Sequence, residues 1–411
     1  MLKRIIKTSF FSVGSRVFMT AATLALTYLV SHGLGEVKLG IFSLTFFFYY
    51  LFAFLTSFEL TIYFGREAAH QRNSAAEMKK LVDDTASVFV MGLGISVILL
   101  VFLFLFYKQL DPAVLFISSI SGIVFGLEKN LSGFLLGKEQ MHVEFVVQAL
   151  SFFIVVIPVW MAIKKIDIIG IYYLRILASM ISILIRWIFS GMRGSFHIKN
   201  IRFRFHNPKE ILLFAVTGLC YFVQYHIDLL ILSFYVSVSH EGAYFLALRI
   251  FTALCLLPEM TTFALTPFIS RVYRDQETAE KGEVLKFHDF YKKIIGSGVL
   301  LGLVSAAFLF FSRHFVSLIF TKENPQLVAH FLTFFAFLLF FRFVSYYTGI
   351  ILSATQFQNV RFYTMIISSI LMIVLGFIFA FFYHAQGILY ARAVMEIFIF
   401  IAYFTYFFEK K

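Results

Sequence analysis

The chain has 411 residues, of which 60% are hydrophobic and only 14% are charged. This composition excludes a sizeable soluble domain. The net charge of +12 is typical of nucleic-acid binding only until the charges are mapped. The basic residues lie in the connections between long apolar segments, where they would face anionic lipid headgroups at the membrane surface. We therefore expect no nucleic-acid partner.

Twelve long apolar segments follow one another along the chain and predict transmembrane helices. Most have the roughly 20 residues that a helix needs to cross about 30 Å of hydrocarbon. Helices are the only plausible spans, because an open strand edge would leave backbone groups unsatisfied in lipid. The segments are 10–34, 38–64, 85–107, 113–136, 143–163, 169–191, 210–236, 241–269, 291–312, 328–353, 360–382 and 386–408.

The connections between these segments alternate in charge. Most of the 35 Lys and Arg residues lie in every second connection, beginning with Lys3, Arg4 and Lys7 at the N-terminus. Because basic residues are retained on the cytoplasmic side of a membrane, the alternation predicts a multi-pass protein with both termini in the cytoplasm.

One long basic connection, 192–209, divides the chain into two sets of six predicted helices. An even number of spans gives both halves the same orientation, which is typical of parallel repeats. We therefore expect an all-α fold of two six-helix bundles around a central cavity, related by a pseudo-two-fold axis along the membrane normal. The predicted domains are 1–205 and 206–411.

Several charged residues lie inside the predicted spans. A charge at the centre of a membrane helix costs about 2.5 to 3.5 kcal/mol, so such residues are expected to face a partner or a wet cavity. These residues are Arg16, Glu59, Glu128, Lys129, Arg175, Arg186, Asp228, Arg249, Glu259, Arg342, Arg392 and Glu396.

Depth within the membrane suggests partners for some of these charges. Asp228 and Arg249 stand about equally far from the turn between the seventh and eighth spans, which predicts a buried ion pair if their faces match. Arg16 and Glu59 stand at nearly matching depth and could pair more loosely. Arg392 and Glu396 are spaced one helical turn apart.

Other charges have competing interpretations. Arg175 and Arg186 lie near opposite ends of the sixth span, so we expect both side chains to snorkel to the headgroups. Glu128 and Lys129, toward the cytoplasmic end of the fourth span, fit either an interfacial or a buried position. Arg342 lies near the middle of its span, cannot snorkel easily, and is expected to serve a cavity.

Searches for catalytic motifs find none. The chain has no phosphate-binding Walker loop, no His-Glu-x-x-His pair, no cysteine-rich cluster and no Gly-x-Ser-x-Gly elbow. The connections on the non-cytoplasmic side are also short. A membrane polymerase or glycosyltransferase needs a longer segment on that side to carry its catalytic carboxylic acids and a substrate-binding groove. We expect no enzyme activity, no metal and no cofactor.

Three segments carry a resemblance to a known family. They are LKRIIKTSFFSVGSR at 2–16, LGEVKLGIFSL at 34–44 and YHIDLLILSFYVSVSHEGAYFLALRIF at 225–251. With the twelve predicted spans, they resemble the Wzx-type flippases for lipid-linked oligosaccharides, within the multidrug/oligosaccharidyl-lipid/polysaccharide exporter superfamily. Asp228, followed by a turn with Gly242 and Tyr244, matches a recurring pattern of that family.

The resemblance implies a function and a mechanism. A flippase would carry a polyprenyl-pyrophosphate-linked repeat unit of O-antigen, capsule or exopolysaccharide across the inner membrane of a bacterium. Arginines in a cavity between the bundles would hold the diphosphate, because guanidinium matches phosphate oxygens with paired donors. Association with a polysaccharide polymerase or chain-length machinery, and coupling to a proton or sodium ion, would be expected.

Particular residues are expected to bind the cargo or to couple its transport to an ion. The expected diphosphate and glycan contacts are Arg249 and Arg342, followed by Lys129 and Arg16. The candidates for ion coupling or ion pairing are Asp228, Glu259 and Glu59.

Two other transporter classes compete with this hypothesis. A cation-coupled small-molecule multidrug antiporter of the same superfamily would have the same two bundles, but its cavity is expected to be dominated by acidic residues, whereas here the cations within spans match or exceed the acids. A major-facilitator carrier also has twelve helices, but its basic, glycine-rich signature is missing from the second connection, GREAAHQRNSAAEMKK.

Overall fold

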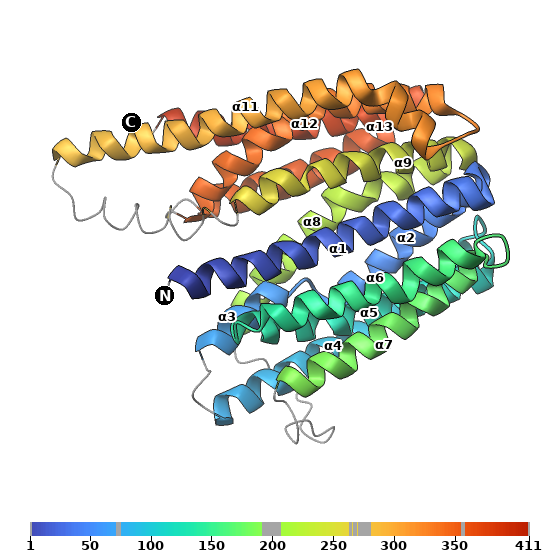
Figure 1. Ribbon diagram of the computed structural model, residues 1–411, viewed down its shortest axis with the longest axis horizontal. Coiled ribbons are helices and arrows are strands. Elements are labelled where there is room, and N and C mark those ends of the chain that lie inside the picture. Colours follow the sequence, from blue (N-terminus) through green and yellow to red (C-terminus); the bar gives the residue numbers. More distant parts are fainter. Residues whose placement is uncertain are drawn as a thin grey trace. The chain divides into compact units, whose positions relative to one another are not determined.

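A computed structural model describes residues 2–70, 75–190, 207–262, 265, 269, 281–354 and 358–409 (Figure 1). Helices dominate this part of the chain, and it contains no β-strand. Eleven helices among the described residues are long and apolar enough to cross a membrane, judged by length and composition. The predicted all-α, multi-pass architecture is therefore confirmed.

The chain divides into two compact units, Met1–Leu230 and Ile231–Lys411. The division falls within one long helix, α8 (Pro208–Tyr235). The boundary that the sequence predicts, after residue 205, lies in the segment 191–206 and so outside the described residues.

Unit 1 is built around a central helix, α5. This helix lies against α2, α3 and α7, while α1 lies against α6, and Figure 1 shows α5, α6 and α7 running alongside one another. The helices of unit 1 that precede α8 are α1 (Leu2–Leu34), α2 (Glu36–Ser57), α3 (Thr61–His70), α4 (Ala75–Phe106), α5 (Pro112–Gly137), α6 (Met141–Ala162) and α7 (Ile168–Ser190).

Glycines bring α5 into close contact with α2 and α3. A Cβ atom on Gly122 would lie 2.2 Å from the carbonyl oxygen of Tyr49, and one on Gly137 would lie 2.4 Å from that of Gly65. Gly126 and Gly133 are equally tight against their neighbours. Small residues spaced four apart let membrane helices approach closely and gain contact where lipid offers no hydrophobic drive.

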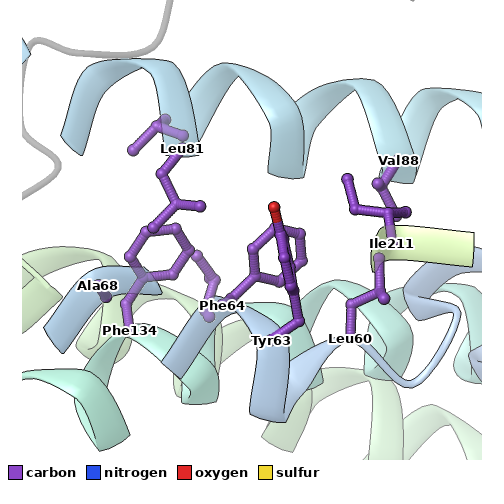
Figure 2. Close-up of a cluster of buried hydrophobic side chains, with 10 residues drawn as sticks. Leu60, Tyr63, Phe64, Ala68, Leu81, Val88, Phe134 and Ile211 are labelled. Carbon is purple, nitrogen blue, oxygen red and sulfur yellow. The ribbon is translucent and has the colours of Figure 1, made fainter. Parts of the chain in front are cut away.

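A buried aromatic and aliphatic cluster joins α3, α4, α5 and the start of α8. Phe64 and Phe134 stack with their ring centroids 6.0 Å apart. Leu81 lies beside this pair, and Val88 and Ile211 lie next to Leu60 at the other side of the cluster (Figure 2). The buried side chains hold these four helices together through van der Waals contact.

The second predicted span, 38–64, is interrupted between α2 and α3. Phe58 and Glu59 both have positive φ, at 47° and 55°, which is rare for residues other than glycine. Two hydrogen bonds join the residues on either side of the break to α5. The side-chain amide of Asn130 donates to the Thr56 carbonyl at 3.3 Å, and the Thr61 hydroxyl donates to the Lys129 carbonyl at 3.1 Å.

Unit 2 contains four described helices besides the end of α8. In this unit α12 lies against α9, α11 and α13. The four are α9 (Val238–Leu254), α11 (Lys281–Phe320), α12 (Pro325–Ala354) and α13 (Gln358–Glu409).

The last helix is two helices joined by a sharp turn. A straight helix of 52 residues would be roughly 78 Å long, far more than the roughly 30 Å of hydrocarbon. Instead His384 breaks the helix with φ 53° and ψ −128°. A Cβ on Gly387 would lie 2.0 Å from the Phe379 carbonyl oxygen, so the turn requires glycine there. The break lies between the predicted spans 360–382 and 386–408.

Candidate functional site

A cavity opens inside unit 1, with walls from α1, α2, α5, α6 and α7. About 80 Å³ of it is open to the centres of water-sized molecules, which is room for several waters. Its aromatic lining is Phe18, Tyr49, Tyr50, Phe125 and Phe152, and its polar and charged lining is Thr23, Glu128, Gln148, Ser151, Arg175 and Ser179. A mostly apolar pocket with a few converging polar groups is typical of a small-molecule site.

Arg175 of α7 reaches this cavity through a group of aromatic rings. Its guanidinium carbon lies 4.9 Å from the ring centroid of Tyr49 and 5.6 Å from that of Tyr172. Phe46 and Phe42 lie 5.5 Å and 5.8 Å away. Ring faces attract a cation, by about 2 kcal/mol where water is excluded. Within the described residues Arg175 forms no ion pair with a carboxylate, so the rings hold its charge without neutralising it.

A second arginine of α7, Arg186, lies in opposite surroundings. Its side chain is only 1% exposed. The Nε and Nη2 atoms donate to the two carboxylate oxygens of Glu144 at 3.0 and 2.8 Å, and Nη1 donates to Glu128 at 2.8 Å. The three residues form one buried network from α5, α6 and α7, which we call the Arg186 triad.

The Arg186 triad and the cavity share one residue, Glu128. Gln148 of the cavity wall also donates to Glu144 at 3.0 Å, and the hydroxyls of Ser151 and Ser182 lie 2.9 Å apart. The Tyr172 hydroxyl donates to Thr45 at 3.0 Å. These hydrogen bonds restrict the movement of the side chains in and behind the cavity wall, so the charged groups of the cavity are held in defined positions.

The break between α2 and α3 holds a further ion pair. Lys129 of α5 bonds Glu59, and the two side chains are 22% and 30% exposed. Gly218 of α8 lies directly against Glu59, where a Cβ would meet the Glu59 Cβ at 2.4 Å. The predicted pairing of Arg16 with Glu59 is thus replaced by a pairing with Lys129, which projects from the helix beside the break.

In unit 2, Arg342 bonds Glu396. Its Nη1 donates to the two carboxylate oxygens at 3.1 and 3.3 Å, and the two side chains are 9% and 0% exposed. Glu396 therefore bonds a residue of α12 rather than Arg392, which lies one turn earlier on its own helix. Arg249 of α9 lies over the ring of Phe245, with 4.7 Å between guanidinium carbon and centroid.

The remaining predicted residues occupy separate places. Asp228 is completely buried and accepts the backbone N–H of Leu229 at 3.0 Å. Glu259 is half-buried in the last turns of the eighth span, and Arg16 is half-buried on α1. The structure brings Lys129 to Glu59 and Arg342 to Glu396, and it places neither Arg16 nor Lys129 on the wall of the unit 1 cavity.

The prediction that Arg186 snorkels to the headgroups is wrong, because the side chain is buried between two carboxylates. Glu128 likewise takes the buried position rather than the interfacial one. Depth could have revealed the triad, since Glu128, Glu144 and Arg186 all lie near the predicted cytoplasmic ends of consecutive spans. No pattern in the sequence singles out the group of rings around Arg175, because 57 Phe and 20 Tyr residues are spread along the chain.

No group of three His, Cys, Asp or Glu residues in the described part of the chain is arranged to hold a metal ion. The polar groups at the cavity are a guanidinium, a carboxylate, an amide and hydroxyls. Such a set can bind an anion at Arg175 and hydrogen-bond a polar neutral group beside it.

No protein-family model and no curated protein matches the chain. Solved structures do match. A multidrug resistance MATE family transporter of the MOP superfamily in its inward-facing conformation is 17% identical, with a TM-score of 0.69 over 96% of this chain and 97% of that one. Its outward-facing counterpart is 16% identical, with a TM-score of 0.67 over 98% and 94%.

A third match is a MOP superfamily transporter from Pyrococcus furiosus, described as having a binding pocket of reverse polarity that suggests a different function. It is 16% identical to this chain, with a TM-score of 0.67 over 98% of this chain and 94% of that one. At these identities the matches show a shared fold, a helical bundle of two lobes.

Proposed function

We propose that this protein is a flippase that carries a lipid-linked oligosaccharide across the cytoplasmic membrane of a bacterium by alternating access. Support for transport comes from the fold, which is shared with MATE family transporters solved in inward-facing and outward-facing conformations. The cargo would be a glycan joined to a polyprenyl chain through a diphosphate. Such a molecule cannot cross hydrocarbon unaided, because its anionic and hydroxylated parts are strongly hydrated.

The observation that carries the proposal is the state of Arg175. It lines the unit 1 cavity, it is ringed by four aromatic side chains, and it forms no ion pair among the described residues. Glu128, the other charged residue of the wall, already bonds Arg186. The cavity therefore offers an anion a guanidinium that no carboxylate of the described chain occupies, which favours an anionic cargo over a cationic one.

The geometry suggests how each part of the cargo would be held. Two N–H groups of Arg175 would donate to diphosphate oxygens. Beside it, Gln148, Ser151 and Ser179 would hydrogen-bond the first sugar, and the aromatic wall would cover its apolar face. The cavity is small, so it would hold the linkage region of the cargo while the prenyl tail stays in lipid.

The residues expected from the sequence keep subsidiary roles in this proposal. Arg249, Arg342, Lys129 and Arg16 are proposed to contact the cargo at other stages. For Arg342 and Lys129 this requires diphosphate to replace Glu396 and Glu59. Asp228, Glu259 and Glu59 remain the proposed coupling residues for a proton or sodium ion.

A reconstituted flipping assay tests the proposal. Purified protein in liposomes would receive a fluorescent short-chain prenyl-diphosphate disaccharide, and a membrane-impermeant quencher would report how fast the label changes leaflet. Wild-type protein should accelerate flipping, and Arg175→Gln should slow it at least about tenfold, because about 1.4 kcal/mol of charge-assisted bonding is lost.

Arg313→Gln is the matched control, since Arg313 also lies over an aromatic ring, Phe310 at 4.2 Å, but on α11 and off the cavity wall. The Arg313→Gln protein should flip the glycolipid at the same rate as wild type. Equal flipping by wild type and Arg175→Gln would contradict the proposal.

A cation-coupled multidrug antiporter is the second candidate, favoured by the descriptions of the solved MATE structures and by the presence of Glu128 on an aromatic cavity wall. The same liposomes, loaded with a fluorescent organic cation, separate the two candidates. Efflux of the cation that depends on Glu128, with no flipping of the glycolipid, would favour the antiporter.

A further inference from the structure

The charged groups of the unit 1 cavity wall are of opposite sign, and one of them belongs to the Arg186 triad. Its wall carries one positive group, Arg175, and one negative group, Glu128. Glu128 belongs to the Arg186 triad, in which two carboxylates share one guanidinium. With all groups ionised the triad has one surplus negative charge, and Arg175 is the positive group on the wall of the same cavity that can offset it.

Hydrogen bonds identify Glu128 as the carboxylate that carries the surplus. Glu144 accepts two N–H bonds from Arg186 and a third from Gln148, so both of its carboxylate oxygens are engaged. Glu128 accepts one bond from Arg186, at 2.8 Å, and one from the Ser179 hydroxyl, so it lacks the bidentate guanidinium contact that Glu144 has. If Glu128 takes up a proton, Arg186 and Glu144 remain as a balanced, bidentate ion pair.

Other ionisable groups packed around Glu128 do not change this balance. Among the side chains that the structure describes, no charged residue of α1, α3 or α4 lines the cavity. Lys129, next to Glu128 on α5, is occupied by Glu59 of the α2–α3 break. The groups that face Glu128 or share its cavity are Tyr49 and Tyr50 of α2, Glu144 of α6, and Tyr172, Arg175 and Arg186 of α7.

We propose that Glu128 takes up a proton when an anion binds at Arg175, so that the diphosphate of the cargo and one proton occupy the unit 1 cavity together. This inference rests on the proposed function, since it requires an anion at Arg175. An anion removes the offset that Arg175 provides and leaves the buried triad with an uncompensated negative charge, which is costly in a site of low dielectric.

The step itself is a simple proton transfer. A proton from water forms an O–H bond with the Glu128 oxygen that Arg186 does not hold, and the other oxygen keeps its hydrogen bond to Nη1. No bond of the cargo changes. A diphosphate diester brings two negative charges, so the site gains one net negative charge instead of two. By linkage, the affinity for the anion falls as the pH rises, by at most about tenfold per pH unit for one proton.

Calorimetry on the full-length protein in lipid nanodiscs tests this coupling. The probe is P1,P2-dimethyl diphosphate, a diester whose own charge stays constant near neutral pH. Titration in two buffers with different heats of ionisation gives the number of protons taken up per anion bound. Wild type should take up a measurable fraction of one proton per anion bound, and its affinity for the probe should weaken as the pH rises.

Glu128→Gln should bind the probe with no proton uptake and with little pH dependence, because glutamine keeps the bond to Arg186 and carries no charge. Asp167→Asn is the matched control, since Asp167 is an exposed carboxylate of unit 1 that bonds Lys38 and should titrate like wild type. Arg175→Gln should abolish binding and proton uptake together.

Two results would overturn the inference in different ways. Arg175-dependent binding of the probe without proton uptake, or with the same uptake in Glu128→Gln, would refute the coupling and leave the anion site intact. Absence of Arg175-dependent binding would refute the anion site, and the coupling with it. If Glu128→Gln does not yield folded protein, proton uptake by wild type compared with Arg175→Gln still decides between these results.

Discussion

The two arginines of α7 carry the same charge but are surrounded by different groups. Arg186 is enclosed by the carboxylates of Glu128 and Glu144, whereas Arg175, three turns earlier, is enclosed by the rings of α2 and by Tyr172. Carboxylates neutralise a guanidinium and make it structural. Rings stabilise the cation but leave its donors for a ligand, so the presence of an arginine in a membrane helix does not by itself reveal its role.

Removing the structural arginine should have the largest effect. Arg186→Leu leaves two carboxylates buried side by side, and the loss of one partner from a buried ionic network costs about 3 to 5 kcal/mol. We expect little folded protein, measured as the monodisperse fraction and melting temperature in detergent. Combining Arg186→Leu with Glu128→Gln and Glu144→Gln should recover part of the stability. A single variant as stable as wild type would show that the Arg186 triad does not hold unit 1 together.

The Arg342 and Glu396 pair of unit 2 should behave like a smaller version of the Arg186 triad. Glu396→Gln and Arg342→Met should each lower stability by about 3 kcal/mol, because each leaves one buried charge without its partner. The double variant, which combines Glu396→Gln with Arg342→Met, should lose less than the sum of the two. Thermal unfolding of the four proteins measures this as a double-mutant cycle, and strict additivity would show that the pair contributes no coupling.

Changing the cavity arginine should affect transport more than stability. Arg175→Lys keeps the charge and the attraction to the rings but loses the paired donors, so glycolipid flipping should fall about tenfold, equivalent to about 1.4 kcal/mol. Its melting temperature should stay near that of wild type. The comparison with Arg186 would fail if Arg175→Lys unfolds the protein or if it flips cargo at the wild-type rate.

The pair at the α2–α3 break should have the smallest effect. Lys129 and Glu59 are 22% and 30% exposed, and ion pairs that water reaches contribute less than about 1 kcal/mol. Lys129→Met should therefore change the melting temperature only slightly, and increased salt should weaken the effect of the pair further. A loss as large as that of Arg186→Leu would mean that the break depends on this ion pair rather than on the bonds of Asn130 and Thr61.

Hydropathy was sufficient to predict where the membrane-spanning helices lie in the sequence. It separated 360–382 from 386–408, and the backbone breaks between them at His384. It did not indicate the interruption at Phe58 and Glu59, because neither glycine nor proline marks that position and the residues on either side of it bond to α5, which is distant in sequence.

The candidate site was harder to predict because it depends on how helices are rotated about their axes. Distance from the end of a span placed Arg186 near the headgroups, yet its side chain points toward α5 and α6. Arg175 acquires its group of rings only when α2 lies against α7, which brings Phe42, Phe46 and Tyr49 to it. Neither arrangement leaves a local pattern in the sequence.

The order of the Arg186 triad along the chain has a consequence for biogenesis. Glu128 and Glu144 belong to α5 and α6 and leave the ribosome before Arg186 does, so two carboxylates reach the membrane ahead of the cation that neutralises them. The insertion machinery must retain these helices, or keep the carboxylates protonated, until α7 arrives. Helices α5 to α7 are therefore expected to be released into lipid as a single group, and a ribosome stalled before Arg186 should leave α5 and α6 cross-linkable to the translocon.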